Sequence, residues 1–175
     1  MKKLWLWLPL GLFLLFFGVV ASGLIKPSSS TIQSRMVGKP LPTFSLPPAH
    51  QPQPGLGSAN FTQGQPRLLN IFASWCIPCV AEAPVLMQMA RQGVQIDGIA
   101  IRDRPQDVAR FLGQHGNPYK RIGSDTESAV QLSLGSSGVP ETFVIDGKGV
   151  IRHQHIGDIR PEDVPEIMAS LKAAR

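Results

Sequence analysis

The amino-acid sequence predicts an α/β domain in which helices cover both faces of a mixed β-sheet, preceded by one apolar N-terminal helix. Three observations predict this arrangement. A long uncharged run opens the chain, runs of strand length alternate with segments of helical periodicity between residues 67 and 134, and two further strands flank a short Asp-Gly turn before a last helix. The alternation is typical of parallel strands, whereas the turn indicates an antiparallel hairpin.

The apolar run extends from Leu4 to Ile25 and contains 22 residues without a charge. As a helix it would measure about 33 Å, which is enough to cross a bilayer. A cleaved signal peptide is the alternative, because Lys2 and Lys3 precede the run and small residues at 21–23 lie near its end. Signal-peptide cores are typically shorter, about 7 to 15 residues, so a retained transmembrane helix is the prediction.

The chain accordingly divides into a membrane anchor at residues 1–25, a tether at residues 26–36 and a folded domain at residues 37–175. The stretch after the anchor is rich in Pro, Ser, Gln and Gly, a composition that cannot form a core of its own. The net charge is +5 without a basic cluster, so no nucleic-acid partner is predicted. Two cysteines exclude a scaffold of several disulfides.

Each element of the domain has its own signal. Residues 67–73 form an apolar run typical of a buried central strand, the next helix has apolar residues at helical spacing up to Gly93, and Gly116 stops the helix that follows. Pro84 should kink the first of these helices, and Asp158 is a possible cap of the last one. The expected order is a short strand at 41–46, a loop at 47–59, a strand at 67–73, a helix at 76–91, a strand at 94–101, a helix at 105–114, a strand at 120–122, a helix at 127–134, hairpin strands at 142–145 and 150–156, and a helix at 161–173.

The sequence Trp75-Cys76-Ile77-Pro78-Cys79 lies where the buried strand turns into a helix. At a helix N-terminus, unpaired amides and the helix dipole stabilise a thiolate and lower a thiol pKa from about 8.5 to roughly 7 or below. Cys76 is therefore the predicted nucleophile, and Cys79, one turn later, is the predicted resolving thiol. Trp75 offers an apolar surface beside the sulfur.

A zinc site is the structural alternative for the two cysteines. Zinc would need two more ligands, and His153 and His155 lie on one face of a predicted strand. No other cysteine or close histidine pair supports them, so we predict no metal and interpret these histidines as solvated strand residues.

Three further residues favour redox chemistry. Val139-Pro140 precedes a strand, where a cis proline would leave the preceding backbone free to pair with a substrate peptide. Glu82 follows Cys79 by three residues on the same side of the helix, so it is close enough to exchange a proton with the site when the mixed disulfide is resolved. Glu141 would place negative charge at the rim of the site. The alternatives are a trans proline that opens the strand and two solvated carboxylates.

The motifs resemble the thioredoxin superfamily and, more closely, the periplasmic thioredoxins of cytochrome c maturation, the CcmG/DsbE type. The resemblance covers about residues 36 to 160 and is carried by Gly38–Phe44, Leu68–Cys76, Gly116–Tyr119 and Gly138–Gly147. Val80 departs from the pattern, because many family members have Arg there, and this changes the charge beside the cysteines.

The resemblance implies a thioredoxin fold tethered by one N-terminal helix to the bacterial inner membrane, with the catalytic domain in the periplasm. It implies reduction of a disulfide in apocytochrome c or in a partner thiol protein, with electrons from a membrane thiol transporter and no cofactor. It also implies an acidic residue at Glu82, a cis proline at Pro140 and an acidic residue at Glu141. A disulfide-forming oxidant, or a binding module for apocytochrome or its chaperone, remains the alternative.

Overall fold

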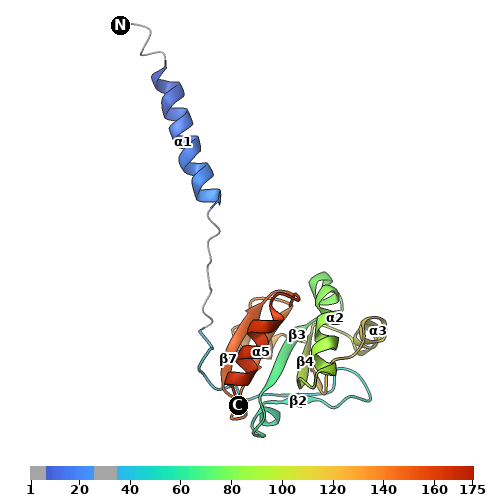
Figure 1. Cartoon of the computed structure of the whole chain (residues 1–175). Helices are drawn as coiled ribbons and strands as arrows, with labels where there is room; N and C mark the ends of the chain where they lie inside the picture. The colour runs from blue at the N-terminus through green and yellow to red at the C-terminus, as the bar shows by residue number, and fades with distance from the viewer. Residues whose placement is uncertain (1–6, 26–34) are drawn as a thin grey trace. The chain divides into compact units, whose positions relative to one another are not determined.

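The computed structural model describes residues 7–25 and 35–175, and the chain divides into two compact units, Met1–Gln33 and Ser34–Arg175. The first unit contains α1 (Leu8–Ile25), a helix of 18 residues (Figure 1). Among the described residues, no helix reaches both the length and the apolar character that a membrane crossing requires. Residues 4–6 of the predicted membrane helix, and residues 26–34 of the predicted tether, lie outside the described ranges.

A five-stranded mixed sheet forms the centre of the second unit, with the strand order β5-β4-β3-β6-β7 (Figure 1). β3 pairs in parallel with β4, and β4 with β5, whereas β6 is antiparallel to both β3 and β7. The predicted mixed sheet and its closing hairpin are thus confirmed. The strands are β3 (Arg67–Phe72), β4 (Ile96–Ile101), β5 (Ile122–Asp125), β6 (Glu141–Ile145) and β7 (Ile151–Ile156).

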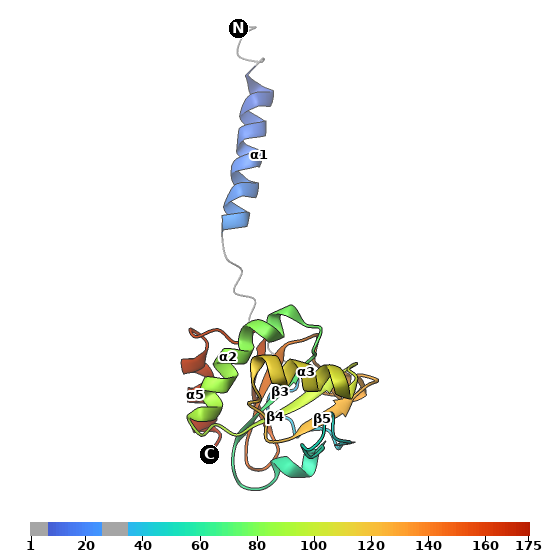
Figure 2. The same cartoon turned by 90° about the vertical axis from the view of Figure 1, so that its right-hand side faces the viewer.

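Three helices, α2 (Ile77–Arg91), α3 (Pro105–His115) and α5 (Val164–Ala173), flank the sheet. Right-handed crossovers place α2 and α3 on one face, and Figure 2 shows these two helices side by side. The N-terminal part of α5 meets α2 at a small cavity lined by residues of both helices. On the other face, β5 is covered by the chain near Leu46 and Leu56, which would contact a Cβ added at Gly123.

The segment before β3 is more ordered than the sequence predicts. The expected loop at residues 47–59 contains β2 (Leu56–Gly57) and the start of the short helix η1 (Ser58–Phe61). β2 pairs with β1 (Ser45–Leu46). The prediction of a loop was wrong in this part because burial of Leu56 and Phe61 in the core stabilises a segment whose Pro- and Gly-rich composition lacks any local strand signal.

The last two helices also begin later than expected. α4 (Ala129–Ser133) follows Ser128, which has a left-handed backbone with φ 56°. The residue that caps α5 by position is Asp163, and not Asp158 as predicted. Asp163 accepts a hydrogen bond from the backbone N–H of Arg160, so a turn over residues 161–163 delays the helix.

Candidate active site

The turn from β3 into α2 holds the two cysteines. Cys76 is the N-cap residue of α2, with extended backbone angles, and its Sγ accepts a hydrogen bond from the Cys79 N–H at 3.2 Å. The two cysteines form a disulfide with their Cα atoms 5.3 Å apart. A sulfur at this position accepts from an amide that the helix leaves unpaired, so the predicted location of Cys76 at the helix N-terminus is confirmed.

Both sulfurs are poorly exposed, whereas their neighbours are open to solvent. Cys76 is 4% exposed and Cys79 is 2% exposed, but Trp75 is 57% and Ile77 is 82% exposed. Cys76 therefore stands between two exposed apolar residues in the chain. Such a surface suits a polypeptide that covers the sulfurs during exchange and excludes water from them.

Asp103 holds the turn in front of Cys76. Its Oδ2 accepts from the Ser74 N–H at 2.7 Å, and its Oδ1 accepts from the Ser74 hydroxyl at 2.5 Å. Asp103 follows β4 and comes next to Ser74 because β3 and β4 are parallel neighbours. Sequence reasoning missed this contact, since nothing local joins residues separated by 29 positions.

Glu82 is buried on the inner side of α2, so the alternative interpretation of this residue as a solvated helix carboxylate is wrong. Its Oε1 accepts from Asn70 Nδ2 at 2.9 Å, and its Oε2 accepts from the Ile159 N–H at 3.1 Å. Burial raises the pKa of Glu82 to about 7, although both hydrogen bonds act in the opposite direction. A group with this pKa can both donate and accept a proton near neutral pH.

Asn70 links Glu82 to two other elements. The Tyr119 hydroxyl donates to Asn70 Oδ1 at 2.7 Å, and Asn70 Nδ2 also donates to Thr142 Oγ1 at 2.9 Å. Burial raises the pKa of Tyr119 well above its ordinary value, so the hydroxyl stays a donor. The one polar residue within the apolar run of β3 was the signal that could have revealed this network.

The Val139–Pro140 peptide is cis, as the family resemblance implies, and the alternative of a trans proline is wrong. Pro140 directly precedes β6, whose Glu141 pairs with Ile71 of β3. Because β3 and β6 are antiparallel, Pro140 lies at the end of the sheet where β3 leaves toward Cys76. Pro140 is buried and its carbonyl accepts from the Gly157 N–H at 3.0 Å, while Val139 is partly exposed.

Glu141 is fully buried, which corrects the expectation of an exposed charge at the rim. Its strand lies between β3 and β7, with Glu141 paired to Ile71 on one side and to Ile156 on the other. The carboxylate accepts from the Ser137 N–H at 3.1 Å and from Gln154 Nε2. Glu141 thereby holds the loop that leads into Pro140.

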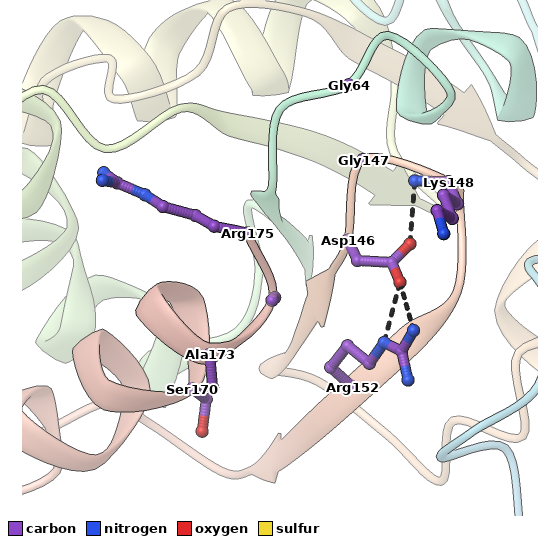
Figure 3. A pocket seen from close by; sticks show the side chains of 9 residues that line it. Gly64, Asp146, Gly147, Lys148, Arg152, Ser170, Ala173 and Arg175 are labelled. Carbon is purple, nitrogen blue, oxygen red and sulfur yellow. Dashed lines mark hydrogen bonds and ion pairs between the residues drawn. The ribbon is translucent and has the colours of Figure 1, made fainter.

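Two of the cavities formed by the described residues exceed 500 Å³. One, of about 560 Å³, adjoins the turn before Cys76 and is lined in part by Trp75 and Asp103. The other, of about 520 Å³, lies at the β6–β7 turn, where Asp146 binds Arg152 and the Lys148 N–H (Figure 3). This turn is at the end of β6 opposite Pro140, so the second cavity is remote from the dithiol.

The predicted solvation of the two histidines on β7 is only partial. His153 and His155 are both half-buried, and burial lowers the pKa of His153. Within residues 7–25 and 35–175, no group of three or more His, Cys, Asp or Glu side chains has the arrangement of a metal site.

A dithiol at a helix N-terminus, beside a cis proline on a mixed α/β sheet, defines the thioredoxin-fold class. The Redoxin family model matches residues 36–171. The Vibrio cholerae protein named Thiol:disulfide interchange protein DsbE is 39% identical to this chain, and the match covers 98% of this chain and 95% of the relative. The Escherichia coli K12 protein of the same name is 36% identical, and the match covers 92% of this chain and 89% of the relative. The chain therefore belongs to the Redoxin family and, within it, to the DsbE-type thiol:disulfide interchange proteins. It is a thiol-disulfide oxidoreductase.

Solved structures agree with this assignment. A putative thiol:disulfide interchange protein DsbE from Chlorobium tepidum superposes with a TM-score of 0.67 and 28% identity, over 79% of this chain and 96% of that one. A Mycobacterium tuberculosis (MTB) protein described as dsbF superposes with a TM-score of 0.63 at 22% identity, over 74% of this chain and 95% of that one, and shows the same fold.

Proposed function

We propose that this oxidoreductase acts as a reductant on the periplasmic side of a bacterial inner membrane, where it reduces a disulfide of apocytochrome c or of a partner thiol protein during cytochrome c maturation. One observation carries the proposal of catalysis by this dithiol: Cys76 caps α2 and its sulfur accepts the Cys79 N–H. The motifs shared with the cytochrome c maturation thioredoxins support the pathway.

The reaction uses both sulfurs in turn. The Cys76 thiolate attacks one sulfur of the target disulfide, forms a mixed disulfide and releases the other target sulfur as a thiolate. The Cys79 thiolate then attacks the Cys76 sulfur, closes the disulfide and releases the second target sulfur, so two electrons pass to the target. The burial of Cys79 and its position one turn along α2 keep it beside the mixed disulfide.

Glu82 is the proposed proton acceptor for Cys79. Both side chains are buried on the same side of α2, three residues apart. With a pKa of about 7, the carboxylate is present in part at neutral pH and can take the thiol proton as Cys79 attacks. The link through Asn70 to Tyr119 keeps the acid in one orientation.

The exposed edge around the disulfide is the proposed docking surface for the substrate peptide. Trp75 would contact its side chains, and the backbone of Val139 before Pro140 would pair with its main chain. Glu141 acts indirectly, through its hydrogen bond to the Ser137 N–H, as a positioning residue for this edge.

The N-terminal helix is the proposed membrane anchor. The described large apolar side chains of α1 are exposed, among them Phe13 at 60% and Leu15 at 68%. The 18 residues of α1 measure about 27 Å, and the uncharged sequence run of 22 residues would measure about 33 Å. In this location a membrane thiol transporter would return electrons to the dithiol.

Alkaline carbonate extraction of membranes tests the anchor. The full chain should stay in the membrane fraction, and its release into the soluble fraction would contradict the anchor.

Substrate trapping tests the assignment. In the Cys79→Ser variant, the full chain expressed in its membrane should accumulate a mixed disulfide through Cys76 with a periplasmic thiol protein, identified by mass spectrometry. Cys76→Ser is the matched control and should trap nothing. If neither variant traps a partner, the proposal fails.

The direction of the reaction is tested separately. Equilibration of the full chain in glutathione buffers should give a reduction potential well below that of a strong oxidant, about −120 mV. A value near −120 mV would instead assign a disulfide-forming oxidant. Because about 30 mV corresponds to 1.4 kcal/mol in a two-electron couple, small local effects decide this potential.

A further inference from the structure

A cationic groove lies beside the turn that leads into Cys76. It has a volume of about 560 Å³, and its walls come from the turn before Cys76, from the segment after β4 and from α3. Two of its lining residues, Ser74 and Trp75, immediately precede Cys76. It is lined by Ser74, Trp75, Arg102, Asp103, Arg104, Asp107, Arg110, Phe111, Gln114 and His115.

Positive charge exceeds negative charge in this lining, which contains three arginines and two aspartates. Both oxygens of Asp103 accept hydrogen bonds from Ser74, so this carboxylate is directed toward the turn before Cys76. Asp107 is shared by two arginines, at 2.6 Å from Arg104 Nε and 3.1 Å from Arg110 Nη1. A ligand in the groove therefore meets guanidinium groups that outnumber the carboxylates.

The arginines keep donors for a ligand. The Arg104 and Arg110 side chains are 79% and 64% exposed, and each uses a single nitrogen on Asp107. Arg102 is fixed by its Nε, which donates to Ser128 Oγ at 2.9 Å, and its backbone has a left-handed φ of 48°. Each guanidinium has five N–H donors, so most of them stay available to carboxylates, which they bind in pairs.

We propose that this groove binds an acidic peptide segment, rich in Asp or Glu, that flanks the exchanged cysteine of the protein substrate. The inference rests on the proposed function and adds the chemistry of the partner. A polypeptide is the occupant because two of the lining residues, Ser74 and Trp75, immediately precede Cys76, so one chain can reach both the groove and the sulfur. Charge complementarity selects acidic side chains, which increase the rate of encounter.

Reduction of matched peptides tests this. The reduced full chain in a nonionic detergent is mixed with two disulfide peptides that differ only in flanking Asp and Glu replaced by Asn and Gln. Rate constants are measured by acid quench and mass spectrometry at about 20 mM and about 500 mM salt. At low salt we expect the acidic peptide to react roughly three- to tenfold faster, and high salt should abolish the difference.

Variants assign this advantage to the groove. In the double variant R104Q/R110Q the rate ratio should fall to about one or below. Arg91→Gln is the matched control, because Arg91 is exposed on α2 at the end away from Cys76, and it should keep the wild-type ratio. Equal rates for both peptides with the wild type, or an equal loss in Arg91→Gln, would overturn the proposal.

A neutral aromatic disulfide, 2,2′-dithiodipyridine, separates this proposal from the function it rests on. The wild type and the double variant should reduce it at the same rate, since it has no carboxylate. A slower reaction in the double variant would show that the arginines act on Cys76 itself and would overturn the groove assignment. A wild type that reduces no disulfide at all would refute the proposed function instead.

Discussion

Glu82 is 1% exposed, and its protonation is coupled to folding. In the unfolded chain this carboxyl has a pKa near 4.5, whereas burial raises its pKa to about 7 in the fold. Between these two values the folded state binds the proton and the unfolded state does not. The stability that this group contributes is therefore complete below pH 4.5 and is lost as the pH rises toward 7.

We predict that the free energy of unfolding of the wild type falls by about 3 kcal/mol between pH 4.5 and 7, relative to that of the Glu82→Gln variant. This size follows because a pKa difference of one between the folded and unfolded chain corresponds to about 1.36 kcal/mol. Urea unfolding of both proteins across this range measures the difference. The comparison cancels the titration of other groups, such as His153, whose lowered pKa has the opposite effect. Parallel curves for the two proteins would contradict the raised pKa.

At the level of elements, β4 packs closely against an aromatic ring of β3 and against Tyr119, which belongs to the network around Glu82. Gly98 on β4 lies under the stacked rings of Phe72 and Tyr119, whose centroids are 4.8 Å apart. A Cβ at Gly98 would be 3.0 Å from an atom of each ring. Glycine is required here by close approach, because a methyl group would push Tyr119 away from Asn70.

We predict that Gly98→Ala lowers the free energy of unfolding by about 1–3 kcal/mol, the usual cost of overpacking a core. Gly113→Ala is the matched control: Gly113 lies inside α3, and nothing lies within 4 Å of its added Cβ. This change should stabilise the chain by about 0.5–1 kcal/mol through helix propensity. Denaturant unfolding measures both, and equal effects would rule out the packing argument.

At the scale of the whole molecule, every residue of the buried apolar core lies between Ala49 and Ala174, and the partly buried residues packed against it begin at Met36. Leu41, Phe44 and Leu46 also pack against the core, although the sequence around them is rich in proline and glycine.

We predict that a fragment of residues 35–175 folds with a free energy of unfolding within about 1 kcal/mol of that of the full chain. A fragment of residues 47–175 should have a free energy of unfolding lower by roughly 3 kcal/mol or more, because it lacks the apolar contacts of residues 36–46. Denaturant titration followed by circular dichroism compares the two fragments with the full chain in detergent. Equal stability of the fragments would show that residues 36–46 add nothing to the core.

Sequence patterns were sufficient for the features that depend on near neighbours. The cysteines at a helix start and the hairpin at residues 146–149 each follow from a few consecutive residues, whereas the cis peptide before β6 was implied by the family resemblance. The short β1–β2 pair could not be predicted in this way, because Leu56 of β2 is buried in a core that is built mainly by residues distant in sequence.

The sequence by itself determined the dithiol at a helix start and the order of strands and helices from β3 onward, because helix capping, periodicity and turns act over a few residues. Only the tertiary structure decided the surroundings of the dithiol. Asp103 meets Ser74 across 29 positions, and Tyr119 meets Asn70 across 49. Burial of a carboxylate, as at Glu82 and Glu141, depends on which elements cover it, and that is settled by packing between segments that are distant in sequence.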